Sequence, residues 1–82
     1  MGLKPLSDRH KDKYVKVGLN IAYYRKERGI TQLELAEKAN ISRSFMSAVE
    51  APKMQVGLSF ESFFDIAEAL EIEPYKLLEF RK

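Results

Sequence analysis

The chain has 82 residues, of which 45% are hydrophobic and 32% are charged. This length suits one domain with a modest hydrophobic core, and we expect no second domain that carries chemistry. The uncharged apolar stretches fall far short of a membrane span, and the sequence contains no cysteine. Membrane insertion, disulfides and cysteine-based zinc sites are therefore not expected.

The first 13 residues are polar and lack the apolar core and cleavage site of a signal peptide. We therefore expect the protein to stay in the cytoplasm, a reducing compartment that suits a chain without cysteine. Residues 1–13 are predicted to form a flexible N-terminal arm that turns helical after Ser7 or Asp8. Residues 14–82 are predicted to form the folded domain.

The net charge of +2 is unevenly distributed along the chain. Residues 1–58 contain eleven Lys and Arg against six Asp and Glu, whereas residues 59–82 contain three against six. A basic half is expected of a protein that binds a polyanion such as a nucleic acid. The acidic half is compatible with binding of a partner protein.

The first predicted helix covers residues 14–28. Val17, Ile21 and Tyr24 recur in it at helical spacing, and Gly29 supplies the residue that ends it. This spacing places one apolar stripe on the core side of the helix.

Two short helices follow with clear start and stop signals. Thr31 and Glu34 form a capping box at the start of the second helix, and Asn40 tolerates the left-handed conformation that ends it. Ser42 caps the third helix, and Pro52 stops it. The apolar positions are Leu33, Leu35, Ala36 and Ala39 in the second helix and Phe45, Met46 and Val49 in the third.

Two further helices complete the predicted fold. Ser59 caps the fourth, and Pro74 suits the first turn of a fifth helix, Tyr75–Phe80. The face predicted to lie in the core of the fourth helix consists of Phe60, Phe63, Phe64, Ile66, Ala67 and Leu70. No strand pattern competes, so the chain is predicted to be all-α with five helices.

The second and third helices have the features of a helix-turn-helix. Ala36 is small enough for two backbones to cross closely, and Asn40 accepts the positive φ of a tight turn. The residues that lock the helix angle are Leu35, Ala39, Ile41, Met46 and Val49. The positions left facing outward on the third helix are Arg43, Ser44, Ser47 and Ala48. Such small polar side chains with one arginine fit a DNA major groove about 12 Å wide.

The segment GITQLELAEKANISRSFMSAVE resembles the helix-turn-helix of the lambda-repressor and Cro-like family, and the likeness extends from Val17 to Phe80. The chain differs from the family at Asn40, where glycine is usual, and at Ala51-Pro52, which replaces the usual Arg-Gly. The resemblance implies a five-helix lambda-repressor-like bundle with the helix-turn-helix as helices two and three. It also implies a transcriptional regulator, and more narrowly a repressor, that binds a near-palindromic double-stranded DNA operator as a homodimer.

The same resemblance assigns DNA contacts to individual residues. The third helix, residues 42–50, is implied to be the recognition helix in the major groove. Its DNA-contacting residues are implied to be Ser42, Arg43, Ser44, Ser47 and Ala48, with Arg43 able to bond guanine bidentately. Gln32 and Lys53 are implied to contact backbone phosphates, Gln32 from the start of the second helix.

Arg25 and Glu50 match a pair that forms a salt bridge between the first and third helices in some members of the family. The resemblance implies that this pair orients the recognition helix. An alternative role for Arg25 is a phosphate contact.

The predicted surface for self-association lies at the end of the chain. Tyr75, Leu77, Leu78 and Phe80 are more apolar side chains than one short helix can bury against its own domain. We therefore expect Tyr75, Leu78 and Phe80 to form a dimer interface, together with residues 54–58.

Two other classes of function compete with DNA binding. An antitoxin-like module would use the acidic helical end to hold a partner protein and would bind DNA secondarily. An enzyme is not expected, because the sequence has no nucleophile–base pair, no phosphate-binding glycine loop and no metal cluster. The single histidine, His10, has no visible catalytic or metal-binding partner. No cofactor is predicted.

Overall fold

The computed structural model describes residues 8–51 and 57–80. Within these ranges the helices are η1 (Asp8–His10, 3-10), α1 (Lys11–Glu27), α2 (Gln32–Ala39), α3 (Arg43–Glu50), α4 (Phe60–Leu70) and η2 (Pro74–Leu78, 3-10). No strand occurs in the described residues. The all-α class predicted from the sequence is confirmed.

The fifth element differs from the prediction in type and length. It is the 3-10 helix η2, which begins at Pro74 and ends at Leu78, where an α-helix was expected to reach Phe80. So short a segment gains too few i→i−4 hydrogen bonds to offset the cost of nucleating an α-helix. The folded part therefore has four α-helices and two 3-10 helices among its described residues.

The start of α1 agrees with the helical turn expected after Ser7 or Asp8. Residues 8–10 form η1, and α1 begins at Lys11, three residues before the predicted boundary at Tyr14. The last residues assigned to the flexible arm thus belong to the helical structure.

The helix-turn-helix has the caps that the sequence predicts. At the start of α2 the Glu34 amide donates to the Thr31 hydroxyl at 3.0 Å, and the Thr31 amide donates to the Glu34 carboxylate at 2.8 Å. Asn40 ends α2 in the left-handed conformation, with φ 58° and ψ 43°. Ser42 then caps α3 by accepting the Phe45 amide at 3.0 Å. Short side chains thus set the bounds of both helices.

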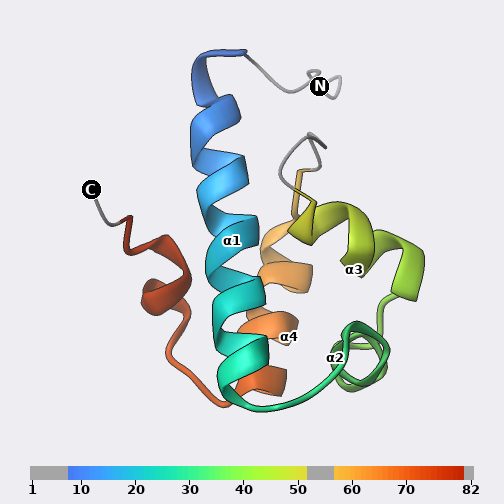
Figure 1. Cartoon of the computed structure of the whole chain (residues 1–82). Coiled ribbons are helices and arrows are strands. Elements are labelled where there is room, and N and C mark those ends of the chain that lie inside the picture. Colours follow the sequence, from blue (N-terminus) through green and yellow to red (C-terminus); the bar gives the residue numbers. More distant parts are fainter. Residues whose placement is uncertain (1–7, 52–56, 81–82) are drawn as a thin grey trace.

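The helices are arranged around α1 (Figure 1). In that view α2 and α3 lie on one side of α1, η2 lies on the other, and α4 lies behind. The buried side chains that join these elements are Ile21, Leu35, Ala36, Ala39, Met46, Val49, Phe63, Ile66, Ala67, Leu70 and Leu77. The fold thus holds α3 and η2 on opposite sides of α1.

Two long-range contacts of α1 hold the C-terminal elements in place. The Asn20 side-chain amide donates to the backbone carbonyls of Leu77 and Glu79, each at 3.0 Å. Just after α1, the cap residue Arg28 pairs with the Glu71 carboxylate at 3.5 Å and donates to the Glu71 backbone carbonyl at 3.2 Å. These bonds attach η2 and the end of α4 to α1.

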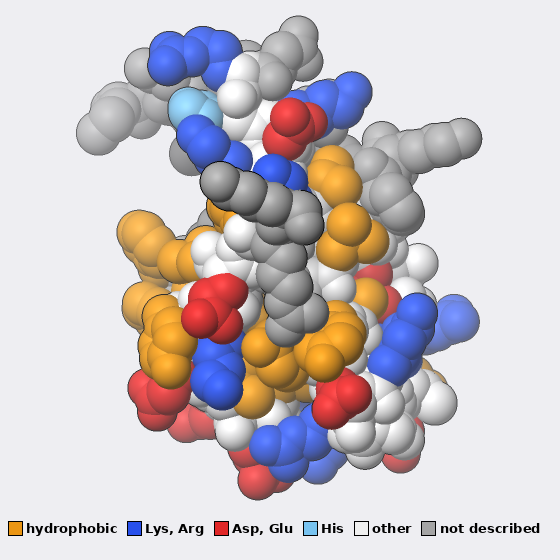
Figure 2. Space-filling view, turned by 60° about the vertical axis from the view of Figure 1, so that its left-hand side comes forward, with side chains coloured by type: hydrophobic (Ala, Val, Ile, Leu, Met, Phe, Trp, Pro, Cys, Tyr) orange, Lys and Arg blue, Asp and Glu red, His pale blue; other side chains and the backbone are white. Residues whose placement is uncertain are grey.

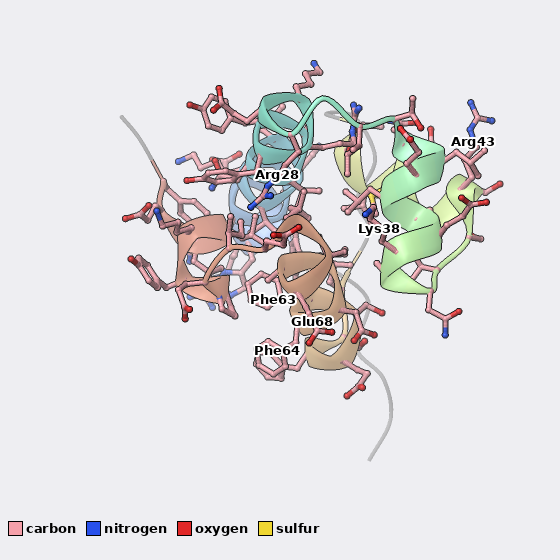
Figure 3. All side chains as sticks on the ribbon, turned by 90° about the horizontal axis from the view of Figure 1, so that it is seen from below. Arg28, Lys38, Arg43, Phe63, Phe64 and Glu68 are labelled. Carbon is pink, nitrogen blue, oxygen red and sulfur yellow. The ribbon has the colours of Figure 1, made fainter. Side chains whose placement is uncertain are left out.

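Three predicted apolar positions are not in the core. Phe60 is 78% exposed, Phe64 is 51% exposed and Leu33 is 47% exposed. Because α4 is apolar on more than one side, only its Phe63 side reaches the interior. Phe60 and Phe64 stack on each other instead, with ring centroids 5.9 Å apart, and Figure 3 shows Phe64 pointing away from the helices.

Candidate nucleic-acid interface

The outer face of α3 consists of small polar side chains and one arginine. Arg43, Ser44 and Ser47 are exposed, and Ala48 is half-buried. The opposite side of α3 is anchored in the core by Met46 and Val49. Figure 3 shows Arg43 pointing away from α2 and α3 into solvent. The packing therefore leaves one side of a short helix free for a ligand.

Ser42 has a structural task in this arrangement. Its hydroxyl oxygen accepts the Phe45 amide and so defines the first turn of α3. The hydroxyl proton stays available to a further acceptor, because a serine hydroxyl can accept and donate at once. Capping and a contact to a ligand are therefore compatible.

An ion pair joins the end of α1 to the end of α3. The Arg25 Nε lies 2.7 Å from Glu50 Oε2, and Arg25 Nη2 donates to Glu50 Oε1 at 3.0 Å. The two side chains are only 12% and 5% exposed. Arg25 Nη1 also donates to the Ile30 carbonyl at 2.8 Å. This bidentate, nearly buried pair fixes the orientation of α3 relative to α1.

Gln32 shares the same carboxylate. Its side-chain Nε2 donates to Glu50 Oε1 at 2.9 Å, so the ion pair is part of a three-residue network that includes the first residue of α2. The sequence does not predict this contact, since it indicates only a phosphate as the partner of Gln32. Gln32 and Glu50 are far apart in the sequence, and no sequence pattern predicts a contact between them.

Next to this network lies an open hollow of about 540 Å³. Its lining consists of Arg25, Thr31, Gln32, Leu33 and Arg43. The start of α2 and the first residue of α3 meet at this hollow. Arg25, Arg43 and the N-terminal end of α2 therefore surround one space. Backbone N–H groups and guanidinium groups both favour an anion.

Other predicted site residues lie elsewhere. Lys53 falls outside the described residues, so its predicted phosphate contact stays a prediction. Tyr75 and Leu78 are 58% and 54% exposed, and Phe80 is 37% exposed beneath Lys16, whose Nζ lies 5.6 Å from the ring centroid. These three residues are at η2 and beyond it, away from the hollow.

The described residues contain no cluster of three or more His, Asp or Glu side chains that could hold a metal ion. None of their helices has both the length and the apolar character needed to cross a membrane.

Comparison with known families identifies the domain. The helix-turn-helix domain family matches residues 18–79, from the middle of α1 to just past η2. The chain belongs to this family. The resemblance stated from the sequence is thus confirmed, and the match covers the whole helix-turn-helix together with the elements that support it.

Curated relatives of this helix-turn-helix protein are regulators. It is 33% identical over 63 residues to the HTH-type transcriptional regulator SinR of Bacillus subtilis, covering 77% of this chain and 56% of that protein. It is 49% identical over 43 residues to the immunity repressor protein of Bacillus phage phi105, covering 52% of this chain and 30% of the repressor. The chain thus spans only part of the length of these relatives.

Two solved structures share this fold. The restriction-modification controller protein C.AhdI from Aeromonas hydrophila is 32% identical, with a TM-score of 0.78 over 87% of this chain and 99% of that one. A hypothetical transcription factor from Neisseria, NHTF, is 26% identical, with a TM-score of 0.77 over 98% of this chain and 88% of that one. The helix-turn-helix protein therefore shares its fold with these two proteins over most of its length.

Proposed function

We propose that the protein is a sequence-specific regulator of transcription, and more narrowly a repressor, that places α3 in the major groove of double-stranded DNA. The observation that carries the proposal is the outer face of α3, where an exposed arginine stands among small side chains on a helix that is anchored in the core. The transcriptional regulators and repressor among its relatives support it. In this proposal the protein binds DNA in the cytoplasm and catalyses no reaction.

The proposal assigns two kinds of contact. Arg43, with Ser44, Ser47 and Ala48, reads base edges, because arginine matches the two acceptors of guanine in the major groove. Gln32 contacts a backbone phosphate at the rim of the hollow, where the N-terminus of α2 favours an anion. Phosphate contacts position the protein, whereas base contacts select the sequence.

Dimerisation follows from the small size of the reading surface. One short recognition helix covers a few base pairs, too few to stand out among roughly 10⁶–10⁹ competing sites in a genome. Two copies related by a two-fold axis read two half-sites about 10 base pairs apart. The operator is then a near-palindrome.

The surface around η2 supports a self-contact there. Leu78, Tyr14 and Val17 line two neighbouring hollows of about 260 and 290 Å³. Figure 2 shows hydrophobic side chains gathered on the face that carries the end of the chain. Phe60 lines the first hollow and Phe80 the second, and Phe60, Leu78 and Phe80 are all exposed. A monomer seldom leaves so many large apolar side chains in water.

The test is selection of bound duplexes from a random DNA pool, followed by affinity measurements at several salt concentrations. We expect one near-palindromic site and an affinity that falls steeply as salt rises, because cationic contacts release counterions from DNA. Failure to enrich any sequence would contradict the proposal. Copurification of a stoichiometric second protein, with weak DNA binding, would favour the antitoxin-like alternative.

A further inference from the structure

We propose that Glu50 is a positioning residue for DNA binding: its buried carboxylate holds the Gln32 side-chain amide in the one orientation that offers an N–H to a DNA phosphate. This inference rests on the proposed function and adds a residue that touches no DNA. It would make the Arg25–Glu50 ion pair part of the binding machinery as well as a support of the fold.

The first step is the chemistry of the Gln32 amide. Its nitrogen carries two N–H donors and its oxygen only accepts, so the two orientations of the amide present opposite groups to a neighbour. The Glu50 carboxylate accepts hydrogen bonds from Arg25 at both of its oxygens and offers no donor in return. The nitrogen of Gln32 must therefore face Glu50, as the 2.9 Å contact to Oε1 shows.

The second step is the rigidity of Glu50. Arg25 donates to both carboxylate oxygens, at 2.7 and 3.0 Å, and is itself held by the Ile30 carbonyl. The Glu50 side chain is 5% exposed. A fixed acceptor of this kind orders Gln32 before any ligand arrives.

The third step is where the ordered amide lies. Gln32 is the first residue of α2 and lines the hollow with Arg43. One of its two N–H groups is bound to Glu50, and the other remains for an acceptor in that hollow. A DNA phosphate accepts hydrogen bonds and donates none, so the orientation that Glu50 imposes is the productive one. Preordering also removes the entropy cost of fixing a flexible side chain on binding.

A double-mutant cycle in DNA affinity tests this coupling. In the parent protein, Gln32→Ala should weaken binding to every duplex by roughly 10- to 150-fold, the loss of one hydrogen bond to a charged group. In the Glu50→Gln background the amide is no longer forced into one orientation. There the loss caused by Gln32→Ala should shrink by roughly 2- to 10-fold.

The matched control is Glu71→Gln, which removes the same negative charge from an exposed pair with Arg28. In this background Gln32→Ala should cost as much as in the parent. Equal losses in the Glu50→Gln and Glu71→Gln backgrounds would overturn the proposal. A parent protein that binds no duplex would instead contradict the proposed function, and the first titration would reveal this before any variant is made.

A second measurement does not depend on the stability of Glu50→Gln. In NMR spectra of the parent, one of the two Gln32 side-chain amide protons should be protected from solvent exchange before DNA is added. The other should shift when the duplex binds. Two equally exchanging protons in the free protein would show that Glu50 does not hold the amide, and would also overturn the proposal.

Discussion

Gly18 of α1 lies directly against the backbone carbonyl of Val49 in α3. A Cβ atom at position 18 would overlap the Val49 carbonyl oxygen, and that atom belongs to a backbone that cannot rotate away as a side chain could. The glycine therefore sets the distance between α1 and α3, and with it the position of the face that we assign to the major groove.

We predict that Gly18→Ala destabilises the protein by about 1–3 kcal/mol, although alanine is the better helix former. Thermal and urea unfolding measure the loss. The control is the exposed position Lys16 in the same helix, where Lys16→Ala should be more stable than Lys16→Gly by about 1 kcal/mol. The same order of alanine and glycine at both positions would contradict the close contact.

The ion pair gives a second prediction about stability. Glu50→Ala leaves Arg25 nearly buried without its partner, so the free energy of unfolding should fall by about 3–5 kcal/mol. Arg28→Gln, which breaks the exposed pair with Glu71, should cost less than about 1 kcal/mol. Chemical denaturation compares the two variants. Similar losses would mean that the Arg25–Glu50 pair is no more important than a surface pair.

The capping box of α2 gives a pH dependence. The backbone N–H of Thr31, and then its side chain, hold the pKa of the exposed Glu34 carboxyl below its usual range. This pKa is lower in the folded than in the unfolded state, so the ionised Glu34 carboxylate stabilises the fold at neutral pH. That stabilisation is lost as the pH falls through the folded-state pKa.

Melting temperatures measured between about pH 7 and about pH 2 test this dependence. The parent should lose more stability on acidification than Glu34→Gln, which has no carboxylate to protonate. Glu37→Gln, a substitution on the same helix outside the capping box, should follow the parent. Parallel curves for the parent and Glu34→Gln would show that the box does not hold the ionised carboxylate.

The helix-turn-helix could be predicted from the sequence because its signals are local. The capping box at Thr31, the serine cap at Ser42 and the left-handed residue Asn40 each act within four residues of the chain, and the structure has all three. By contrast, Glu71 ends α4 in the left-handed conformation at φ 58° without any sequence preference for it. Its position is set by packing and by the contacts with Arg28.

The features missed in the sequence are long-range contacts. The sequence does not predict that Gly18 packs against the Val49 carbonyl. Nor does it predict that Asn20 donates to two backbone carbonyls near the end of the chain. Phe60 and Phe64 were wrongly assigned to the core because periodicity cannot say which side of an apolar helix meets the domain. Such contacts depend on the assembled fold.

The proposed dimer surface makes a prediction about assembly. Leu78→Glu should convert the dimer to a monomer without loss of fold, because Leu78 is 54% exposed in a single copy. Leu19→Glu, the same change at a leucine that is 47% exposed on α1 and lines neither hollow at η2, should leave the dimer intact. Light scattering at matched concentrations decides between them. A dimeric Leu78→Glu variant would rule out this surface.

The most direct test of the account is the affinity of the parent and of Arg43→Ala for the selected operator and for an unrelated duplex at one salt concentration. If Arg43 reads a base, Arg43→Ala should weaken operator binding by about 1–3 kcal/mol and leave binding to the unrelated duplex nearly unchanged. Equal losses on both duplexes would contradict the placement of α3 in the major groove as the reader of sequence.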